Sequence, residues 1–308
     1  MHSFQHASHK IRKRVGLALI ATLFSVTGFT PSAQAGIGDE DGVLMGAGAH
    51  FAWIVFDALK ADLERVTGRE TVLFGQYSML GVGCNAGIKA AKQNKLGHET
   101  FGFVCCPLTE EEIAKNKLIV YPLAQEPILI LVRQDNPISN LSSQQVKDIF
   151  AGKVLNWKEV GGPDKPIVVV TRLHCKDRPG HWKTILPDAN EFRQERLNVK
   201  SASDMIQRIN DFSGAIGHTG STWKFDSEDK VKWVTIDGIA PTSENLKNGK
   251  YPFHRQMSAI TNEHPSPAIV KLIKEAQTGP AFQKIAKKYN LLPLNPMQQS
   301  TAKNDATP

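Results

Sequence analysis

The feature that most constrains the fold is a repeated order in which a short apolar run is followed by a turn and then by an amphipathic helical pattern. Apolar runs of strand length occupy residues 43–45, 71–74, 101–104, 128–132, 167–171 and 214–217. Stretches with apolar residues at helical spacing occupy 51–63, 86–92, 109–116, 142–150, 201–209, 267–274 and 279–289. Repeated strand–turn–helix units predict an α/β fold with a parallel sheet and helices on both faces.

The turns between these units carry two kinds of helix-start signal. Gly46-Ala47-Gly48 and Gly81–Gly83 predict glycine-rich turns, which can point backbone N–H groups and a helix dipole at an anion. Thr109 and Glu112 have the spacing of a capping box, and Ser142 opens the helical pattern that follows it.

The first 35 residues have the composition of an export signal. A basic stretch of Lys10, Arg12, Lys13 and Arg14 precedes an apolar run from Val15 to Phe29, and Ala33-Gln34-Ala35 forms a small-x-small cleavage site. No later stretch approaches the roughly 20 apolar residues of a spanning helix. We therefore expect residues 1–35 to be a cleavable signal peptide and the mature protein to be periplasmic.

The charge of the chain is less informative than it first looks. Residues 1–35 hold four basic and no acidic residues, so without them the formal charge falls from +7 to +3. This modest charge does not favour a nucleic-acid partner, and none is expected. The remaining residues 36–308 are enough for one large domain or for two lobes of ordinary size.

One long run resembles a known family. The sequence LSSQQVKDIFAGK at 141–153, followed by NWKEVGG at 156–162, is similar to a signature of the phosphate-binding protein family of ABC phosphate importers. Shorter segments occur in the family's order: GAGA at 46–49, the glycines at 81 and 83, Phe101-Gly102 before Pro107-Leu108, Arg172 after an apolar run, and GAIG at 214–217. The resemblance covers essentially all of the chain after residue 35.

This resemblance implies a type II periplasmic-binding fold, with two α/β lobes, a two-strand hinge and a ligand cleft between the lobes. Placed on this chain, it predicts lobe one at 36–122 plus 255–308 and lobe two at 123–254. The hinge is expected near 121–127 and 251–256. It also implies a solute-binding protein of an ABC-type uptake system, monomeric, with no cofactor and no enzymatic activity.

The sequence departs from the family at the positions that bind phosphate in the family's members. His50 stands where the family usually has threonine, and Cys84 occupies the serine region of the second turn. Cys105 and Cys106 replace an aspartate near a proline. The family's polar phosphate ligands are therefore absent from the first half of the expected site.

The second half of the expected site departs in the same way. After Arg172, a run with His174, Cys175 and Lys176 replaces a Ser-Gly-Thr turn, and His218 replaces a frequent tyrosine. Mapped through the resemblance, the ligand-binding residues are expected to be His50, Phe51, Cys84, Cys105, Cys106, Arg172, His174, Cys175 and Lys176.

Three interpretations of the cysteines stay open at this point. In the first, the four thiols form disulfides, because an even cysteine count in an exported protein favours them. The adjacent Cys105 and Cys106 would either bond to different partners, for which Cys84 and Cys175 are the only candidates, or form a strained vicinal bond with each other. A Cys84–Cys105 bond would tie two loops of one lobe, and a bond to Cys175 would span the cleft.

In the second interpretation, thiols and imidazoles bind a soft metal or metalloid such as Cu(I), Zn(II) or trivalent arsenic, since sulfur donors select soft ions. The metal-ligand candidates are then His50, Cys84, Cys105 and Cys175. In the third, the ligand is still an oxyanion or an organic anion, held by Arg172, Lys176 and Arg178.

Two further alternatives concern the role of the protein. A secreted thiol-dependent enzyme would need a nucleophile signature, and no local cysteine-protease motif surrounds any of the four cysteines. A sensory subunit would present its ligand to a membrane sensor kinase instead of an ABC permease. Either partner would use lobe closure about the hinge, so the sequence leaves that choice open.

Overall fold

The computed structural model describes residues 42–74, 83–92, 99–223 and 229–294. The expected signal peptide and Gly81 lie outside these residues. No helix in the described part of the chain is long and apolar enough to cross a membrane.

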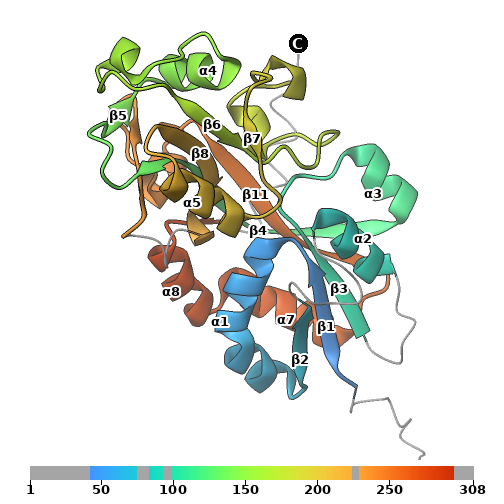
Figure 1. Cartoon of the computed structure of the whole chain (residues 1–308). Helices are drawn as coiled ribbons and strands as arrows, with labels where there is room; N and C mark the ends of the chain where they lie inside the picture. Colours follow the sequence, from blue (N-terminus) through green and yellow to red (C-terminus); the bar gives the residue numbers. More distant parts are fainter. Residues whose placement is uncertain (1–41, 75–82, 93–98, 224–228, 295–308) are drawn as a thin grey trace, which may run out of the picture. The chain divides into compact units, whose positions relative to one another are not determined.

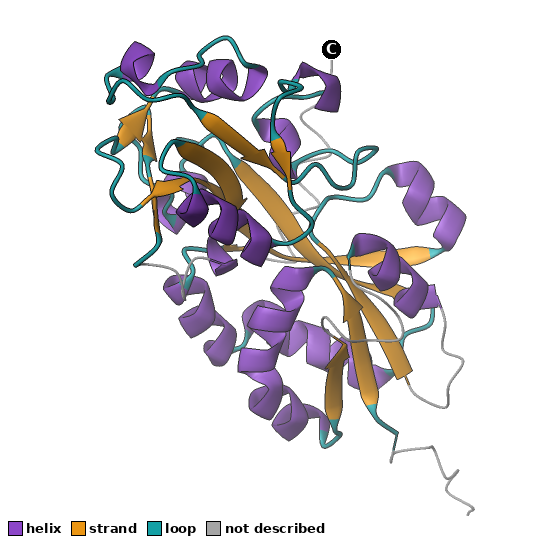
Figure 2. Ribbon diagram, in the orientation of Figure 1, coloured by secondary structure: helices purple, strands orange, loops and turns teal. Residues whose placement is uncertain are grey.

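The described residues alternate between strands and helices along most of the chain (Figures 1 and 2). The strands are β1 (Leu44–Gly48), β2 (Thr71–Phe74), β3 (Glu99–Val104), β4 (Leu118–Arg133), β5 (Asn140–Leu141), β6 (Val168–Thr171), β7 (Leu197–Asn198), β8 (Ala215–Gly220), β9 (Val231–Trp233), β10 (Thr235–Ile236), β11 (His254–Asn262) and β12 (Leu292–Pro293). The α-helices are α1 (His50–Thr67), α2 (Cys84–Lys92), α3 (Glu110–Asn116), α4 (Ser143–Ala151), α5 (Ala202–Asp211), α6 (Ser243–Lys247), α7 (Pro267–Thr278) and α8 (Pro280–Lys288).

The long strand β4 connects the two halves of the main sheet (Figure 1). The sheet has the order β2-β1-β3-β11-β4-β8-β6-β7, with β9 and β12 also paired to β4. The first half of β4 pairs with β11 and its second half with β8 and β9, all antiparallel. Strands β1, β2 and β3 are parallel, as are β6, β7 and β8, so the expected α/β fold is confirmed.

The hydrophobic core follows the same division of the sheet. One cluster combines residues from 44–124 with residues from 257–291, and two further clusters contain residues from 128–253. The burial of these apolar faces stabilises each half of the sheet with its own helices. The exact lobe boundaries and the hinge stay a prediction.

The first glycine segment differs from its expectation. Gly46 and Gly48 are strand residues of β1, not a turn. A Cβ on Gly46 would lie 2.8 Å from the rings of Phe101 and Phe103, and one on Gly48 would lie 2.3 Å from the Phe103 carbonyl oxygen. These glycines are therefore explained by the close approach of β3 to β1.

The helix-start signals are confirmed. The Thr109 hydroxyl accepts a hydrogen bond from the Glu112 backbone N–H, and the Glu112 side chain accepts one in return from Thr109. Ser142 and Gln145 form the same capping box at α4. Both boxes satisfy N–H groups that would otherwise lack a partner at the helix start.

Candidate functional site

Two cysteines meet where a helix begins and a neighbouring strand ends. Cys84 is the first residue of α2, and Cys105 follows directly after β3. Their Sγ atoms lie 3.6 Å apart, and the backbone N–H of Cys105 donates to Cys84 Sγ at 3.3 Å. Both side chains are buried.

The other two cysteines complete a single cluster, which we call the thiol cluster (Cys84, Cys105, Cys106 and Cys175). The sulfurs of Cys84, Cys106 and Cys175 all lie within 4.8 Å of one another, and Cys105 Sγ lies 4.0 Å from Cys106 Sγ. Cys175 comes from the loop after β6 and has a φ of 52°, a left-handed conformation that few residues other than glycine adopt. All four cysteines are free in the structure, so none of the expected disulfides is formed in it.

His174 joins the thiol cluster through one ring nitrogen. Its Nε2 lies 3.8 Å from Cys105 Sγ, and its Nδ1 lies 3.2 Å from the carbonyl oxygen of Arg172. A carbonyl oxygen only accepts hydrogen bonds, so Nδ1 carries the proton and Nε2 presents a lone pair toward the sulfur.

The three thiols that lie within 4.8 Å of one another hold their protons unequally. The hydrogen bond with Cys106 lowers the pKa of Cys175 to about 4, and hydrogen bonding with Cys105 lowers the pKa of Cys84. Hydrogen bonding with Cys105, together with burial, raises the pKa of Cys106. Cys175 is therefore a thiolate at neutral pH, and Cys106 is the thiol that donates to it.

Behind His174, two more histidines extend into the core. The rings of His174 and His181 are 4.3 Å apart between centroids, and those of His181 and His218 are 6.0 Å apart. His181 Nδ1 accepts from the backbone N–H of Trp182 at 2.8 Å. Both ring nitrogens of His218 are buried without a hydrogen-bond partner among the described residues.

The environment keeps these two inner histidines neutral. Burial lowers the pKa of His218 to about 3, and the nearby His174 and Arg172 act in the same direction. Burial also lowers the pKa of His181 well below its usual value, again helped by His174. Neutral imidazole is the form that packs in an apolar core without an ionic partner.

Arg178 connects the loop after β6 to helix α3 and to α2. Its guanidinium donates to both carboxylate oxygens of Glu112 at 2.7–3.0 Å and to Asn85 Oδ1 at 2.9 Å. It also lies 3.7 Å from Cys175 Sγ. The Arg178 hydrogen bonds hold the pKa of Glu112 below its usual value.

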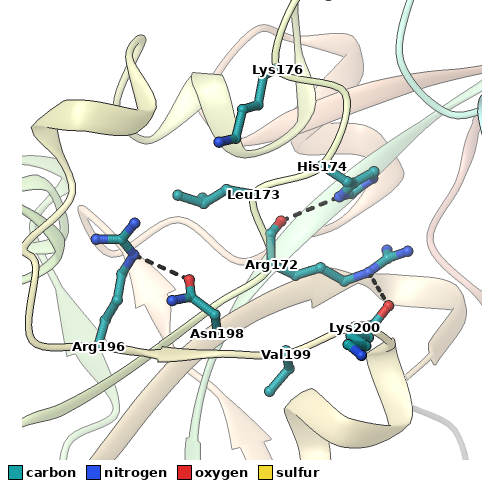
Figure 3. Close-up of a pocket in the computed structure, with 8 residues that line it drawn as sticks. All are labelled: Arg172, Leu173, His174, Lys176, Arg196, Asn198, Val199 and Lys200. Atoms are coloured by element: carbon teal, nitrogen blue, oxygen red, sulfur yellow. Dashed lines mark hydrogen bonds between the residues drawn. The ribbon is translucent and has the colours of Figure 1, made fainter.

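A basic pocket opens beside this loop (Figure 3). It has a volume of about 440 Å³, and its lining contains four basic side chains and no acidic one: Arg172, Leu173, His174, Lys176, Arg196, Asn198, Val199 and Lys200. The Arg172 Nε donates to the Lys200 carbonyl oxygen at 2.9 Å, which is the one hydrogen bond its guanidinium makes among the described residues. The remaining N–H groups of Arg172 are therefore available to an anion.

A second pocket adjoins the first, because Arg172, His174 and Lys176 line both. It has a volume of about 450 Å³ and reaches two members of the thiol cluster, Cys84 and Cys175. The rest of its lining is Gly83, Asn85, Glu112, Asp177 and Arg178. Basic groups and sulfur atoms thus face one continuous region.

A buried ion pair stands near this region. Arg255 donates to Glu126 Oε2 at 2.5 Å, and Thr222 donates to Glu126 Oε1 through its N–H at 2.8 Å and its hydroxyl at 2.6 Å. Glu126 is fully buried and Arg255 is 4% exposed. The pair joins β4 to β11 and satisfies both charged groups.

The expected site residues fall into three groups. Arg172, His174, Cys175, Lys176 and Cys84 line the two pockets, and Cys105 and Cys106 lie directly behind them. Phe51 is fully buried in the core against Phe103 and lines neither pocket. The side chain of His50 lies outside the described residues.

No sequence signal selects several other residues of this region. Arg196 and Lys200 join the basic pocket from the segment around β7, and no motif marks them. Glu112 was explained by its capping box alone, although it also binds Arg178. Trp182 is buried in the core close to this region.

Comparison with known proteins decides the family. A family model described as a PBP superfamily domain matches residues 34–279. The chain belongs to the PBP superfamily. Its resemblance to phosphate-binding proteins is also confirmed, because its curated relatives include the phosphate-binding protein PstS of Bacillus subtilis and that of Borreliella burgdorferi.

These relatives match the PBP-superfamily chain over part of its length. The Bacillus protein is 30% identical over 154 residues, which are 49% of this chain and 50% of that protein. The Borreliella protein is 25% identical over 196 residues, or 60% of this chain and 69% of that one. The matched segment therefore spans about half the length of the Bacillus relative.

Solved structures confirm the type II periplasmic-binding fold. A Clostridium perfringens protein solved with bound phosphate has a TM-score of 0.69, with 24% identity, 83% of this chain covered and 100% of that chain. An ABC-type phosphate transport receptor from Vibrio cholerae has a TM-score of 0.61, with 24% identity, 82% of this chain covered and 100% of that chain. At this identity, the likeness establishes the fold of the PBP-superfamily chain.

Proposed function

We propose that this chain is the exported solute-binding component of an ABC-type uptake system and that it binds a small oxyanion, phosphate or a close analogue, at Arg172. The observation that carries the proposal is the basic pocket, whose four cationic side chains have no acidic neighbour in the lining. An anion entering it would replace water at the Arg172 guanidinium with charge-assisted hydrogen bonds.

Three further observations support this proposal. The relatives named above are phosphate-binding proteins, and none of them is named as an enzyme. Residues 1–35 have the composition of an export signal, which favours a periplasmic location. Ala49, the N-cap residue of α1, makes no side-chain hydrogen bond to the first N–H groups of that helix, and uncapped helix N-termini favour anions.

The partner that reads the bound state is proposed to be an ABC permease. The solute would be released unchanged, since the proposal assigns the chain no catalytic step. A membrane sensor kinase is the alternative partner, and co-purification with membranes that hold only one of the two separates them.

The test is a calorimetric titration of the reduced, mature protein with phosphate and sulfate. We expect saturable one-to-one binding of phosphate by the parent protein. In Arg172→Met the Kd for phosphate should rise at least about tenfold, because a charge-assisted bidentate contact is removed. Arg208→Met, at an exposed position of α5 that lines neither pocket, is the matched control and should bind as the parent does. Equal binding by both variants, or no binding of any oxyanion, would overturn the proposal.

A further inference from the structure

We propose that the thiols of Cys84, Cys106 and Cys175 form a binding site for a soft, thiophilic ion. The site lies in the wall of the second pocket and goes beyond the proposed anion function. Because the anion is assigned to basic side chains, a failure of the ion site to bind a soft ion would leave the proposed anion site unaffected.

The spacing of the sulfurs is the first support. A metal–thiolate bond is about 2.3 Å long, so thiolates around one ion lie about 4 Å apart. The three sulfurs lie within 4.8 Å of one another, and the neighbouring Cys105 lies 3.6 Å from Cys84 and 4.0 Å from Cys106. Sub-ångström adjustments would bring three sulfurs onto one ion.

The second support is that each sulfur is positioned by a different element. Cys84 begins α2, Cys106 follows β3, and Cys175 stands in the loop after β6. The left-handed backbone of Cys175 is strained for a residue with a side chain, and such strain is concentrated at functional sites. The turn is held by the hydrogen bond from the Arg178 N–H to the Cys175 carbonyl oxygen at 3.1 Å.

The donor set selects the class of ion. Thiolates prefer soft or borderline ions, among them Cu(I), Zn(II) and trivalent arsenic, over hard ions such as Mg²⁺. Cys106 also belongs to a second group of donors with Cys105 and His174, again within 4.8 Å. In that second group, Nε2 of His174 presents its lone pair toward Cys105 Sγ at 3.8 Å, so sulfur and nitrogen donors adjoin the three thiols.

The chemistry balances without an oxidant or reductant. A metal cation that binds the three sulfurs displaces the protons of those that are still thiols, and these protons pass to solvent. Arsenite binds by exchange, in which As(OH)3 and three thiols, the Cys175 thiolate taking up one proton from solvent, give one As–S bond for each sulfur and three molecules of water. Arg178, 3.7 Å from Cys175 Sγ, compensates the negative charge of bound thiolates.

The experiment uses the mature protein, reduced and kept free of oxygen, with four thiols counted by a chromogenic disulfide reagent before use. It is titrated separately with Cu(I), arsenite, Zn(II) and Mg²⁺. After unbound ion is removed, the amount of each element bound per chain is measured by inductively coupled plasma mass spectrometry. We expect one soft ion per chain, no bound Mg²⁺, and fewer titratable thiols in the loaded protein. In Cys175→Ser, the affinity should fall at least about tenfold, the size of loss that even indirect perturbation of metal ligands produces.

Two controls keep the outcome interpretable. Arg172→Met should lose phosphate binding and keep the soft ion, whereas Cys175→Ser should lose the ion. Cys175 is partly exposed in a loop, so this variant is expected to fold, and Cys106→Ser tests the buried position of the same site. If the reduced, folded protein with four free thiols binds none of the soft ions, the inference is wrong; phosphate binding in the same sample would leave the proposed function intact.

Discussion

Glu112 and Arg178 form a bidentate ion pair between helix α3 and the loop that follows β6. Arg178 Nη2 and Nε donate to the Glu112 carboxylate at 2.7 and 3.0 Å, across 66 positions of sequence. The same arginine stands next to Cys175 and Asn85. This pair therefore fixes the loop that supplies both a thiol and basic side chains to the adjoining pockets.

Replacement of Glu112 by glutamine should lower the free energy of unfolding by about 1–2 kcal/mol, because a charge-assisted pair is lost from a partly buried position. The folded-state pKa of Glu112 is lowered, so its contribution is present above its unfolded pKa and is lost as the pH falls through the folded value. Urea denaturation at several pH values measures both effects. Glu111→Gln, an exposed neighbour in the same helix, should change little, and equal effects of the two variants would contradict the assignment.

Replacement of Glu126 by glutamine should be more damaging than any exposed ion-pair substitution. It would leave the Arg255 charge buried without its partner, which costs about 3–5 kcal/mol. Asp62→Asn, which breaks the exposed pair with Arg65, is the control and should cost below about 1 kcal/mol. Thermal unfolding of the two variants side by side decides the point, and comparable losses would show that the buried pair is not a major stabilising contact.

The lowered pKa of His218 makes the free energy of unfolding depend on pH. Its folded-state pKa of about 3 lies below the unfolded value of 6.5, so the unfolded chain binds the proton first and stability falls as the pH drops below about 6.5. Between pH 7 and pH 5.5 this amounts to about 1 kcal/mol, in addition to the same trend from His181.

His218→Phe tests this dependence. Phenylalanine keeps the ring contact with Phe150, at 5.8 Å between centroids, and removes two buried nitrogens that have no partner among the described residues. The variant should be at least as stable as the parent at pH 7 and should lose less stability on acidification. A denaturation profile with the parental slope below pH 6.5 would contradict this account.

Gly46 tests the explanation of the first glycine segment. Gly46→Ala should destabilise the protein by about 1–3 kcal/mol, since the added Cβ would lie 2.8 Å from two phenylalanine rings in the core. Gly68→Ala, where a Cβ meets nothing within 4 Å and the penalty is that of a left-handed residue, should cost about 1 kcal/mol. An unchanged melting temperature for Gly46→Ala would contradict the explanation of Gly46 by the close approach of β3 to β1.

The sequence predicts the elements of this fold well and the contacts of the site only in part. Apolar periodicity and capping residues are local signals, so β2, α3 and α4 lie close to where the pattern places them. The positions of the cysteines could be predicted because they follow a strand or begin a helix.

Contacts between residues far apart in the sequence have no local sequence pattern that would predict them. The Glu112–Arg178 and Glu126–Arg255 pairs join residues 66 and 129 positions apart. The direction of the loop after β6 depends on the left-handed backbone of Cys175 and His181, which no periodic pattern encodes.

The central claim is that the basic side chains bind an anion in a pocket that adjoins the thiol cluster. The most direct measurement is the rate at which iodoacetamide alkylates Cys175, followed by peptide mass spectrometry, with and without saturating phosphate. Because Arg172, His174 and Lys176 line both pockets, bound phosphate should slow alkylation of Cys175 severalfold, and Arg172→Met should abolish the protection. An alkylation rate unchanged by phosphate at a concentration that saturates binding would contradict the claim.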